Sequence, residues 1–249
     1  MPFAEWHLLR INIQRGRLSS LRNELKKLAN PKQAVLLQGF FKTGKGEYGE
    51  GDVFLGIKVP DTRKVAKKFR ELSFKEIDNS LKSKIHEERL AALLILVDRY
   101  AKADEKEKKE IFEFYLAHAD RVNNWDLVDL SAPKIVGEYL LDKDRKVLYR
   151  LAESENLWEK RISIISTFTF IRNNDFEDTL KISEVLLKDE HDLIHKAVGW
   201  MLREVGKKDI KEEEKFLKKH YRDMPRTMLR YAIEKFPENK RKAYLKGKA

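Results

Sequence analysis

The chain has 249 residues, of which 42% are hydrophobic and 37% charged, with a formal net charge of +11 at pH 7. This length is enough for a substantial hydrophobic core, and 11 Gly and 6 Pro are too few turn residues for an all-β fold of many short strands. The absence of cysteine excludes disulfide bonds, a cysteine nucleophile and a cysteine-bound metal.

The predicted location is the cytoplasm. No apolar run approaches the roughly 18 to 20 residues of a membrane span. The start, Met1 to Glu5, lacks the charged and apolar regions of a signal peptide. We therefore expect a soluble, unsecreted protein with no membrane partner.

Helical periodicity runs through most of the sequence. In residues 88–100, Leu90, Leu93, Leu94 and Val97 have the i, i+3, i+4, i+7 spacing of a buried helix face. Similar stripes predict helices over 106–118, 125–141, 157–171, 175–188, 192–204, 210–221 and 225–236. Three residues are expected to punctuate them: Pro133 bends or restarts its helix, Gly206 follows a helix, and Pro225 lies in a first turn.

A repeat underlies these helices. Arg89, Arg161, Lys196 and Arg226 each open a similar apolar helical segment, at separations of 72, 35 and 30 residues, and the segment from Trp125 falls midway across the first gap. A helix pair of this size cannot bury its own apolar face. The sequence therefore predicts an all-α fold, an α-solenoid of stacked HEAT-like helical hairpins in one domain of residues 1–249. The concave face of such a solenoid is the expected binding surface.

The segment Lys42 to Pro60 departs from the helical pattern and holds five of the 11 glycines. It does not match the Walker pattern, since Gly44-Lys45-Gly46 has neither the spacing nor the Ser/Thr ending. A flexible loop beside a substrate and an ordinary loop between helices both stay open.

Several residues could carry chemistry, and each also has a structural explanation. Trp125 and Asp129, four residues apart, project from one helix face. Arg161 offers a planar set of donors to a phosphate, or a salt bridge to a neighbour. For Trp200, packing in the core is the more common role in such a segment. His191 and His195 have an i, i+4 spacing but no evident third metal ligand, so we expect no metal site.

These residues, in this order and spacing, resemble the AlkD-like family of DNA alkylation repair enzymes, which are HEAT-like-repeat DNA glycosylases. The resemblance covers almost the whole chain. It rests on five segments: Phe40 to Arg63, Asn123 to Pro133 (NNWDLVDLSAP), Leu157 to Arg161 (LWEKR), His195 to Lys207 (HKAVGWMLREVGK) and Arg226 to Leu245.

The resemblance implies a catalytic cleft lined by Trp125, Asp129, Arg161 and Trp200, and hydrolysis of the N-glycosidic bond of N3- or N7-alkylated purines in duplex DNA. Asp129 would stabilise the developing charge on the sugar. Arg161 would hold a phosphate, and the two tryptophans would contact the lesion and the backbone. The family grips a deformed backbone rather than extruding the base. No metal or organic cofactor is implied, and we expect a monomer.

The net charge supports a nucleic-acid partner. Residues 207–249 hold 15 Lys/Arg and seven Asp/Glu, which gives this stretch a net charge of +8. An excess of this kind favours binding to a polyanion, with an affinity that falls as salt rises. The candidate phosphate contacts are Arg203, Lys207, Lys208, Arg226 and Arg230. Two alternatives stay open: a non-catalytic module that binds damaged or structured nucleic acid, and a protein-interaction scaffold.

Overall fold

The computed structural model describes residues 16–249, and its regular elements are helices. Within this range there is no strand, and the only β pairing is an isolated parallel bridge between Val53 and Ile85. The predicted all-α class is therefore confirmed. Among the described residues, no helix has the length and apolar character needed to span a membrane. Met1 to Glu5, on which the expectation of no signal peptide rests, lie outside the described range.

The chain divides into two compact units, unit 1 (Met1–Leu127) and unit 2 (Val128–Ala249). The expectation of one domain over residues 1–249 stays a prediction.

Unit 1 is built around one buried helix. After a helical stretch at 16–27, its elements are α2 (Pro31–Phe40), α3 (Val59–Lys68), α4 (Phe74–Leu81), α5 (His86–Tyr100), α6 (Glu105–Ala117) and a 3-10 turn (Ala119–Arg121). Helices α3, α4 and α6 all pack on α5, whose residues 90–97 are buried without exception. Side-chain caps at Asn30, Ser73 and Asp104 begin α2, α4 and α6.

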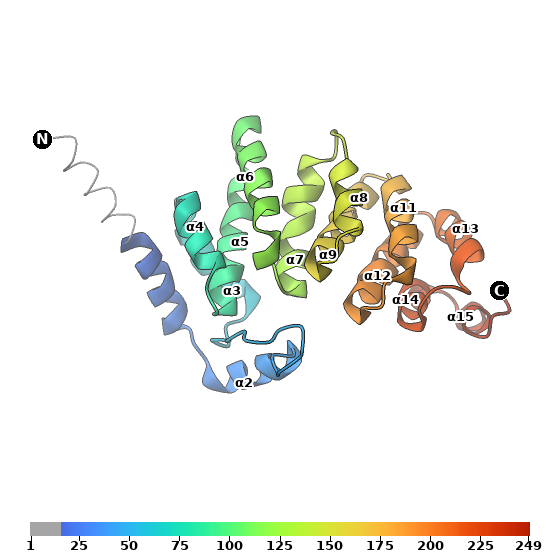
Figure 1. The fold of residues 1–249 in the computed structure, drawn as a ribbon, viewed down its shortest axis with the longest axis horizontal. Coiled ribbons are helices and arrows are strands. Elements are labelled where there is room, and N and C mark those ends of the chain that lie inside the picture. Colours follow the sequence, from blue (N-terminus) through green and yellow to red (C-terminus); the bar gives the residue numbers. More distant parts are fainter. Residues whose placement is uncertain (1–15) are drawn as a thin grey trace, which may run out of the picture. The chain divides into compact units, whose positions relative to one another are not determined.

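Unit 2 consists of successive helical pairs. Helix α7 (Trp125–Ala132) leads into it, followed by α8 (Lys146–Ala152), α9 (Leu157–Ser166), α10 (Phe168–Arg172), α11 (Glu177–Val185), α12 (Asp192–Lys208), α13 (Ile210–His220), α14 (Arg226–Ala232) and α15 (Glu238–Leu245). Helix α12 packs between α9 and α14, while α8 packs on α9 and α11. Figure 1 shows α9, α12 and α14 in one layer and α8, α11 and α13 in the other. This is the stacking of helical hairpins that the repeat predicts.

Pro133 and Gly206, which are expected to bend and to follow a helix, differ in outcome. Pro133 does interrupt its helix, because α7 ends at Ala132 and Pro133–Gly137 forms a π-helical turn. The sequence suggests that Gly206 follows a helix, but this residue lies inside α12. The reason is close packing: a Cβ added at Gly206 would lie 1.6 Å from Oε2 of Glu213, a residue only 1% exposed. Burial is the main cause that raises the pKa of Glu213 to about 8, with Glu214 adding to the effect.

Candidate functional site

The centre of the candidate site in unit 2 is an ion pair between Arg161 and Asp129. Asn156 caps α9 by accepting hydrogen bonds from the backbone N–H groups of Trp158 and Glu159, and Arg161 follows one turn later. Its Nε and Nη2 donate to Oδ1 and Oδ2 of Asp129 at 3.0 and 2.8 Å. Its Nη1 donates to the carbonyl of Leu193 at 2.7 Å. The guanidinium therefore holds both carboxylate oxygens in a fixed plane.

The two members of this pair differ in their access to solvent. The side chain of Arg161 is 5% exposed and that of Asp129 is 14% exposed. Because Arg161 uses at least three of its five N–H groups within the chain, at most two remain for a phosphate. The geometry favours a role for Arg161 in positioning Asp129. Its predicted contact with a phosphate stays a prediction.

Trp200 lies in the same unit, on α12. Its Nε1 donates to Oε1 of Glu204 at 3.0 Å, and its ring centroid is 5.9 Å from that of Phe168. Leu193, whose carbonyl accepts from Arg161, is seven residues earlier on this helix. Since seven residues make about two turns, Trp200 shares a helix face with Leu193, roughly 10 Å farther along the axis.

Trp125 belongs to an aromatic cluster of unit 1. Its backbone N–H donates to the side chain of Asn124 at 2.8 Å at the beginning of α7. Its ring stacks on Phe41 at a centroid distance of 5.1 Å and an interplanar angle of 18°, and meets Phe40 edge to face at 5.9 Å. The side chain is half-buried, so packing fixes its orientation while part of it stays accessible.

A buried polar network next to this cluster was not predicted from the sequence. His86 Nε2 lies 2.8 Å from Oδ2 of Asp126, and its Nδ1 lies 3.6 Å from Oδ2 of Asp52. Arg89 Nη2 donates to the same Asp52 oxygen at 2.6 Å. Each of these four side chains is less than 10% exposed.

The network favours its charged forms. Burial by itself lowers the pKa of His86, but the ion pair and hydrogen bond with Asp126 outweigh burial, so the pKa is raised. Burial likewise opposes ionisation of Asp52, yet the nearby imidazole of His86 and the paired guanidinium of Arg89 hold its pKa below the usual range. The signal missed in the sequence is the run His86 to Arg89, which resembles a solvated helix start.

The glycine-rich segment is anchored to α5, the helix that carries Glu87. The carboxylate of Glu87 accepts the backbone N–H groups of Leu55, Gly56 and Ile57 at 2.9, 2.8 and 3.1 Å. Gly56 has a φ of +84°, and a Cβ there would lie 2.2 Å from the carbonyl oxygen of Asn30. This part of the segment is therefore a fixed connection between α2 and α3.

The two histidines of the i, i+4 pair have structural contacts. The ring of His191 accepts from the backbone N–H of Leu193 and caps α12, and His195 Nε2 lies 2.5 Å from the carbonyl oxygen of Asp189. Within the described part of the chain, no group of three or more His, Asp or Glu side chains is placed to hold a metal.

The five candidate phosphate contacts differ in availability. Arg203 is the most engaged, since it pairs with Glu204 and Glu234 and its side chain is 15% exposed. The other four, Lys207, Lys208, Arg226 and Arg230, are exposed. Lys207 pairs with Glu204, and Lys208 and Arg226 each donate to a backbone carbonyl.

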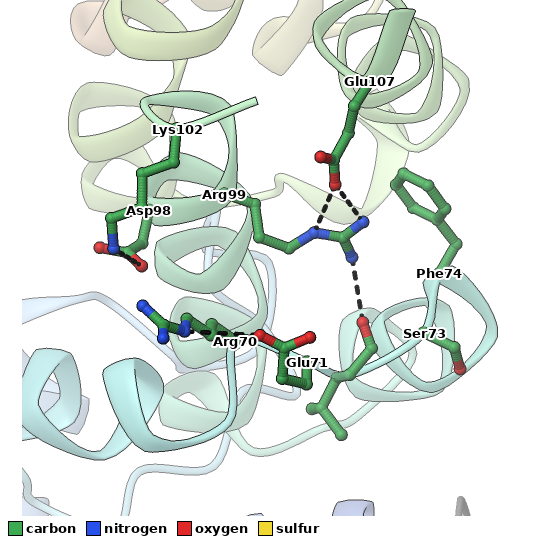
Figure 2. Close-up of a pocket in the computed structure, with 9 residues that line it drawn as sticks. Arg70, Glu71, Ser73, Phe74, Asp98, Arg99, Lys102 and Glu107 are labelled. Atoms are coloured by element: carbon green, nitrogen blue, oxygen red, sulfur yellow. Dashed lines mark hydrogen bonds and ion pairs between the residues drawn. The ribbon is translucent and has the colours of Figure 1, made fainter. Parts of the chain in front are cut away.

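Unit 1 contains a cavity of about 450 Å³ that offers no comparable chemistry to the ion pair of Asp129 and Arg161. Figure 2 shows that its charged side chains face one another. Arg99 binds Glu107 at 2.6 Å and the carbonyl of Leu72 at 3.0 Å. The remaining charges pair as Arg70 with Glu71 and Asp98 with Lys102. Because these charges are satisfied internally, we treat this cavity as a structural crevice.

Comparison with known proteins gives a consistent result. The model of a family described as DNA alkylation repair enzyme matches residues 21–236. A structure described as a predicted DNA alkylation repair enzyme from Enterococcus faecalis superposes with a TM-score of 0.65 at 18% sequence identity, covering 84% of this chain and 97% of that one. At this identity the similarity shows a shared fold. No curated protein gives a significant sequence match.

Proposed function

Because the chain belongs to the DNA alkylation repair enzyme family, we propose that it is a DNA glycosylase that hydrolyses the N-glycosidic bond of N3- or N7-alkylated purines in duplex DNA. The observation that carries this proposal is the two-point ion pair between Asp129 and Arg161, which presents an oriented and partly exposed carboxylate. These are two of the residues to which the family resemblance assigns the reaction.

The chemistry suits a carboxylate without a strong general acid. Alkylation at N3 or N7 makes the purine a cation, so the base is already a good leaving group. As the bond to the sugar lengthens, positive charge develops on the sugar ring, and Asp129 stabilises it and orients the attacking water. The base leaves as a neutral molecule, water adds to the sugar carbon and releases one proton to the solvent, and an abasic site remains.

Arg161 acts mainly through Asp129 in this proposal. Two parallel hydrogen bonds define the plane of the carboxylate, and the bond to Leu193 fixes the guanidinium against α12. An orientation that exists before the substrate binds requires no rearrangement during the reaction. Any contact of Arg161 with a DNA phosphate uses the remaining N–H groups.

The two tryptophans bind the cationic substrate. Trp200 comes from the same unit as the ion pair, and Trp125 precedes Asp129 by one turn of α7. Cation–π contacts with such rings contribute roughly 0.5 to 2 kcal/mol each. Stacking on Phe41 holds Trp125, and the hydrogen bond to Glu204 holds Trp200, so both rings are oriented in advance.

General DNA affinity comes from the basic residues that follow. Lys207, Lys208, Arg226 and Arg230 are exposed and would neutralise phosphates without regard to sequence. Arg203, which is held by two glutamates, would contribute less. We further propose a cytoplasmic monomer that works as one domain, without a metal or organic cofactor.

The decisive experiment is base release from alkylated duplex DNA under single-turnover conditions. We expect methylated purine to be released by the native chain, and release to be greatly reduced by Asp129→Asn in a folded protein. DNA binding without release would instead support a non-catalytic module. Weak DNA binding near physiological salt would support a protein-interaction scaffold.

A further inference from the structure

Two arginines of unit 2 lie over phenylalanine rings of α10, but only one of them also binds carboxylates. Arg145 Cζ lies 3.8 Å from the ring centroid of Phe170, and its Nη1 pairs with two carboxylates at 2.6 and 2.7 Å. Arg172 is exposed, and its Cζ lies 4.4 Å from the ring centroid of Phe168. Among the residues that the structure describes, no carboxylate pairs with Arg172.

The contact with Phe168 restrains the guanidinium of Arg172 without occupying its donors. Side chains of a helix lean towards its N-terminus, so Arg172, the last residue of α10, lies back over the ring one turn earlier. A cation–π contact attracts the charge but supplies no carbonyl or carboxylate oxygen. The N–H groups of Arg172 therefore remain available to an incoming anion, for which a planar set of donors is well suited.

A second cation without a carboxylate partner lies beside Arg172. Lys208, the last residue of α12, is exposed and donates from Nζ to the backbone carbonyl of Arg172 at 3.4 Å. Within the described part of the chain it forms no ion pair. A cation at a helix C-terminus is favourable for the helix itself, which explains Lys208 but not Arg172, whose charge lies back over Phe168. Two neighbouring cations without a counter-charge attract a polyanion.

The ring that holds Arg172 also connects it to the candidate site. The ring centroids of Phe168 and Trp200 are 5.9 Å apart, so Cζ of Arg172 lies within about 10 Å of the Trp200 ring. Successive charges of one DNA strand are spaced by about 3.4 Å along the helix axis, so this separation corresponds to about three nucleotides at most. A strand that contacts Trp200 therefore has a phosphate within reach of Arg172.

We propose that Arg172, restrained by Phe168 and with Lys208 beside it, binds a backbone phosphate within about three nucleotides of the position that contacts Trp200. The inference deepens the proposed function and rests on it for the partner, duplex DNA. The two charged oxygens of a phosphodiester accept the parallel N–H donors of one guanidinium edge. Arg172 is a binding residue here: it holds the strand against Trp200 and takes no part in bond cleavage.

The first test measures affinity by fluorescence anisotropy over a range of salt concentrations. The probe is a duplex with one tetrahydrofuran analogue of an abasic site, which has no base to release. Arg172→Ala should lower the affinity about tenfold and reduce the slope of log affinity against log salt by about 0.9, the value for one phosphate contact.

Arg150→Ala is the matched control. Arg150 is an exposed arginine on α8, in the other helix layer of unit 2 (Figure 1), and no carboxylate of the described chain pairs with it. We expect its removal to leave the affinity and the slope unchanged. Arg172→Lys keeps the charge but not the planar donors, so it should retain the slope and lose affinity only about two- to fivefold. Thermal unfolding checks that each variant is folded.

The second test locates the phosphate. Phosphates of the same duplex are replaced one at a time by an uncharged methylphosphonate. The native chain and Arg150→Ala should lose affinity at a position within about three nucleotides of the abasic analogue, and Arg172→Ala should be insensitive at that position. Equal sensitivity of the native chain and Arg172→Ala at every position in this range overturns the inference.

The third test concerns the ring of Phe168. Phe168→Leu keeps an apolar side chain but removes the aromatic face, and it should weaken binding about two- to fivefold. The effect should be smaller when Arg172→Ala is already present. Any part of the effect that passes through Trp200 is the same in both backgrounds, so the difference between them belongs to Arg172. Equal effects in the two backgrounds would show that the ring does not hold the guanidinium for binding.

The outcomes separate this inference from the proposed glycosylase, because binding is measured without base release. If the native chain releases alkylated purine but Arg172→Ala keeps the native affinity and slope, the phosphate contact is wrong and the glycosylase stands. If Arg172→Ala shows the expected losses but no base is released from alkylated DNA, the contact stands and the glycosylase is wrong. A native chain that does not bind the duplex near physiological salt overturns both.

Discussion

Two carboxylates of α7, three residues apart, have opposite environments. Asp129 in unit 2 accepts two hydrogen bonds from Arg161 and stays partly exposed. Asp126 in unit 1 pairs with a buried imidazole through one oxygen and leaves the other without a partner. The first arrangement presents an oriented and partly exposed negative charge, and the second leaves a buried acceptor without a donor. Environment, more than residue type, therefore determines what each carboxylate can do.

The largest expected effect comes from Asp129→Asn. The amide keeps the shape of the side chain but removes the charge that stabilises the sugar, so single-turnover base release should fall by about 10²- to 10³-fold. The measurement is the rate of methylpurine release at saturating enzyme, with thermal unfolding as the folding control. A rate within a few fold of the native value would remove Asp129 from the reaction.

Asp126→Asn should have the opposite balance of effects: a large loss of stability and a smaller loss of base release. Loss of one partner leaves the buried His86 without its closest counter-charge, so the free energy of unfolding should fall by about 3 kcal/mol. The rate of release, normalised to folded protein, should change less than for Asp129→Asn. Chemical denaturation and the same release assay provide the measurement, and a stable Asp126 variant would contradict the structural importance of the network.

The buried network of unit 1 should also make the stability of the chain depend on pH. The pKa of His86 is raised in the folded chain, so its contribution to stability is complete below the ordinary histidine value of about 6.5 and is lost as pH rises through the folded value. Denaturation midpoints measured from mildly acidic to mildly alkaline pH should show this loss. His86→Gln should flatten the profile, and an unchanged slope in that variant would assign the loss to another group.

A smaller effect is expected from Arg161→Lys. Lysine keeps the positive charge but cannot reproduce the two parallel hydrogen bonds to Asp129, so release should slow by about tenfold with little change in DNA affinity. If affinity falls instead while the rate at saturation is preserved, Arg161 acts mainly as a phosphate contact, as the family resemblance implies.

The smallest effects concern the general grip on DNA. Single replacements of Lys207, Lys208, Arg226 or Arg230 by Ala should each reduce the slope of log affinity against log salt by about 0.9, without regard to sequence. Arg203→Ala should change the slope less, because Glu204 and Glu234 already neutralise it. Slopes unchanged from that of the native chain in all of these variants would show that other residues neutralise the DNA phosphates.

The sequence predicts the helices of unit 2 because each has a long apolar stripe. It fails where packing between neighbouring helices decides which residue is tolerated. Gly206 resembles a helix end, but it lies inside α12, where the absence of a Cβ leaves room for the carboxylate of Glu213.

The candidate site shows the same limit. Residue types and motif spacing identify Asp129 and Arg161, but their mutual hydrogen bonds span 32 positions and cannot be deduced from periodicity. The run from His86 to Arg89 is more misleading, since four consecutive polar residues suggest a solvated helix start. All four are at most 3% exposed, because partners from distant segments neutralise them. Their burial emerges only from the fold.

The glycine inside α12 has a consequence for the electrostatics of the last helices. With a pKa of about 8, Glu213 is mostly protonated at pH 7. The formal count assigns it a full negative charge, so the stretch 207–249 is closer to +9 than to +8 at neutrality. As the pH rises past 8, Glu213 ionises and the net positive charge of this region falls, although no lysine or arginine titrates. The absence of a side chain at Gly206 thus allows Glu213 to be buried, and this changes the electrostatic field that the neighbouring helices present to DNA.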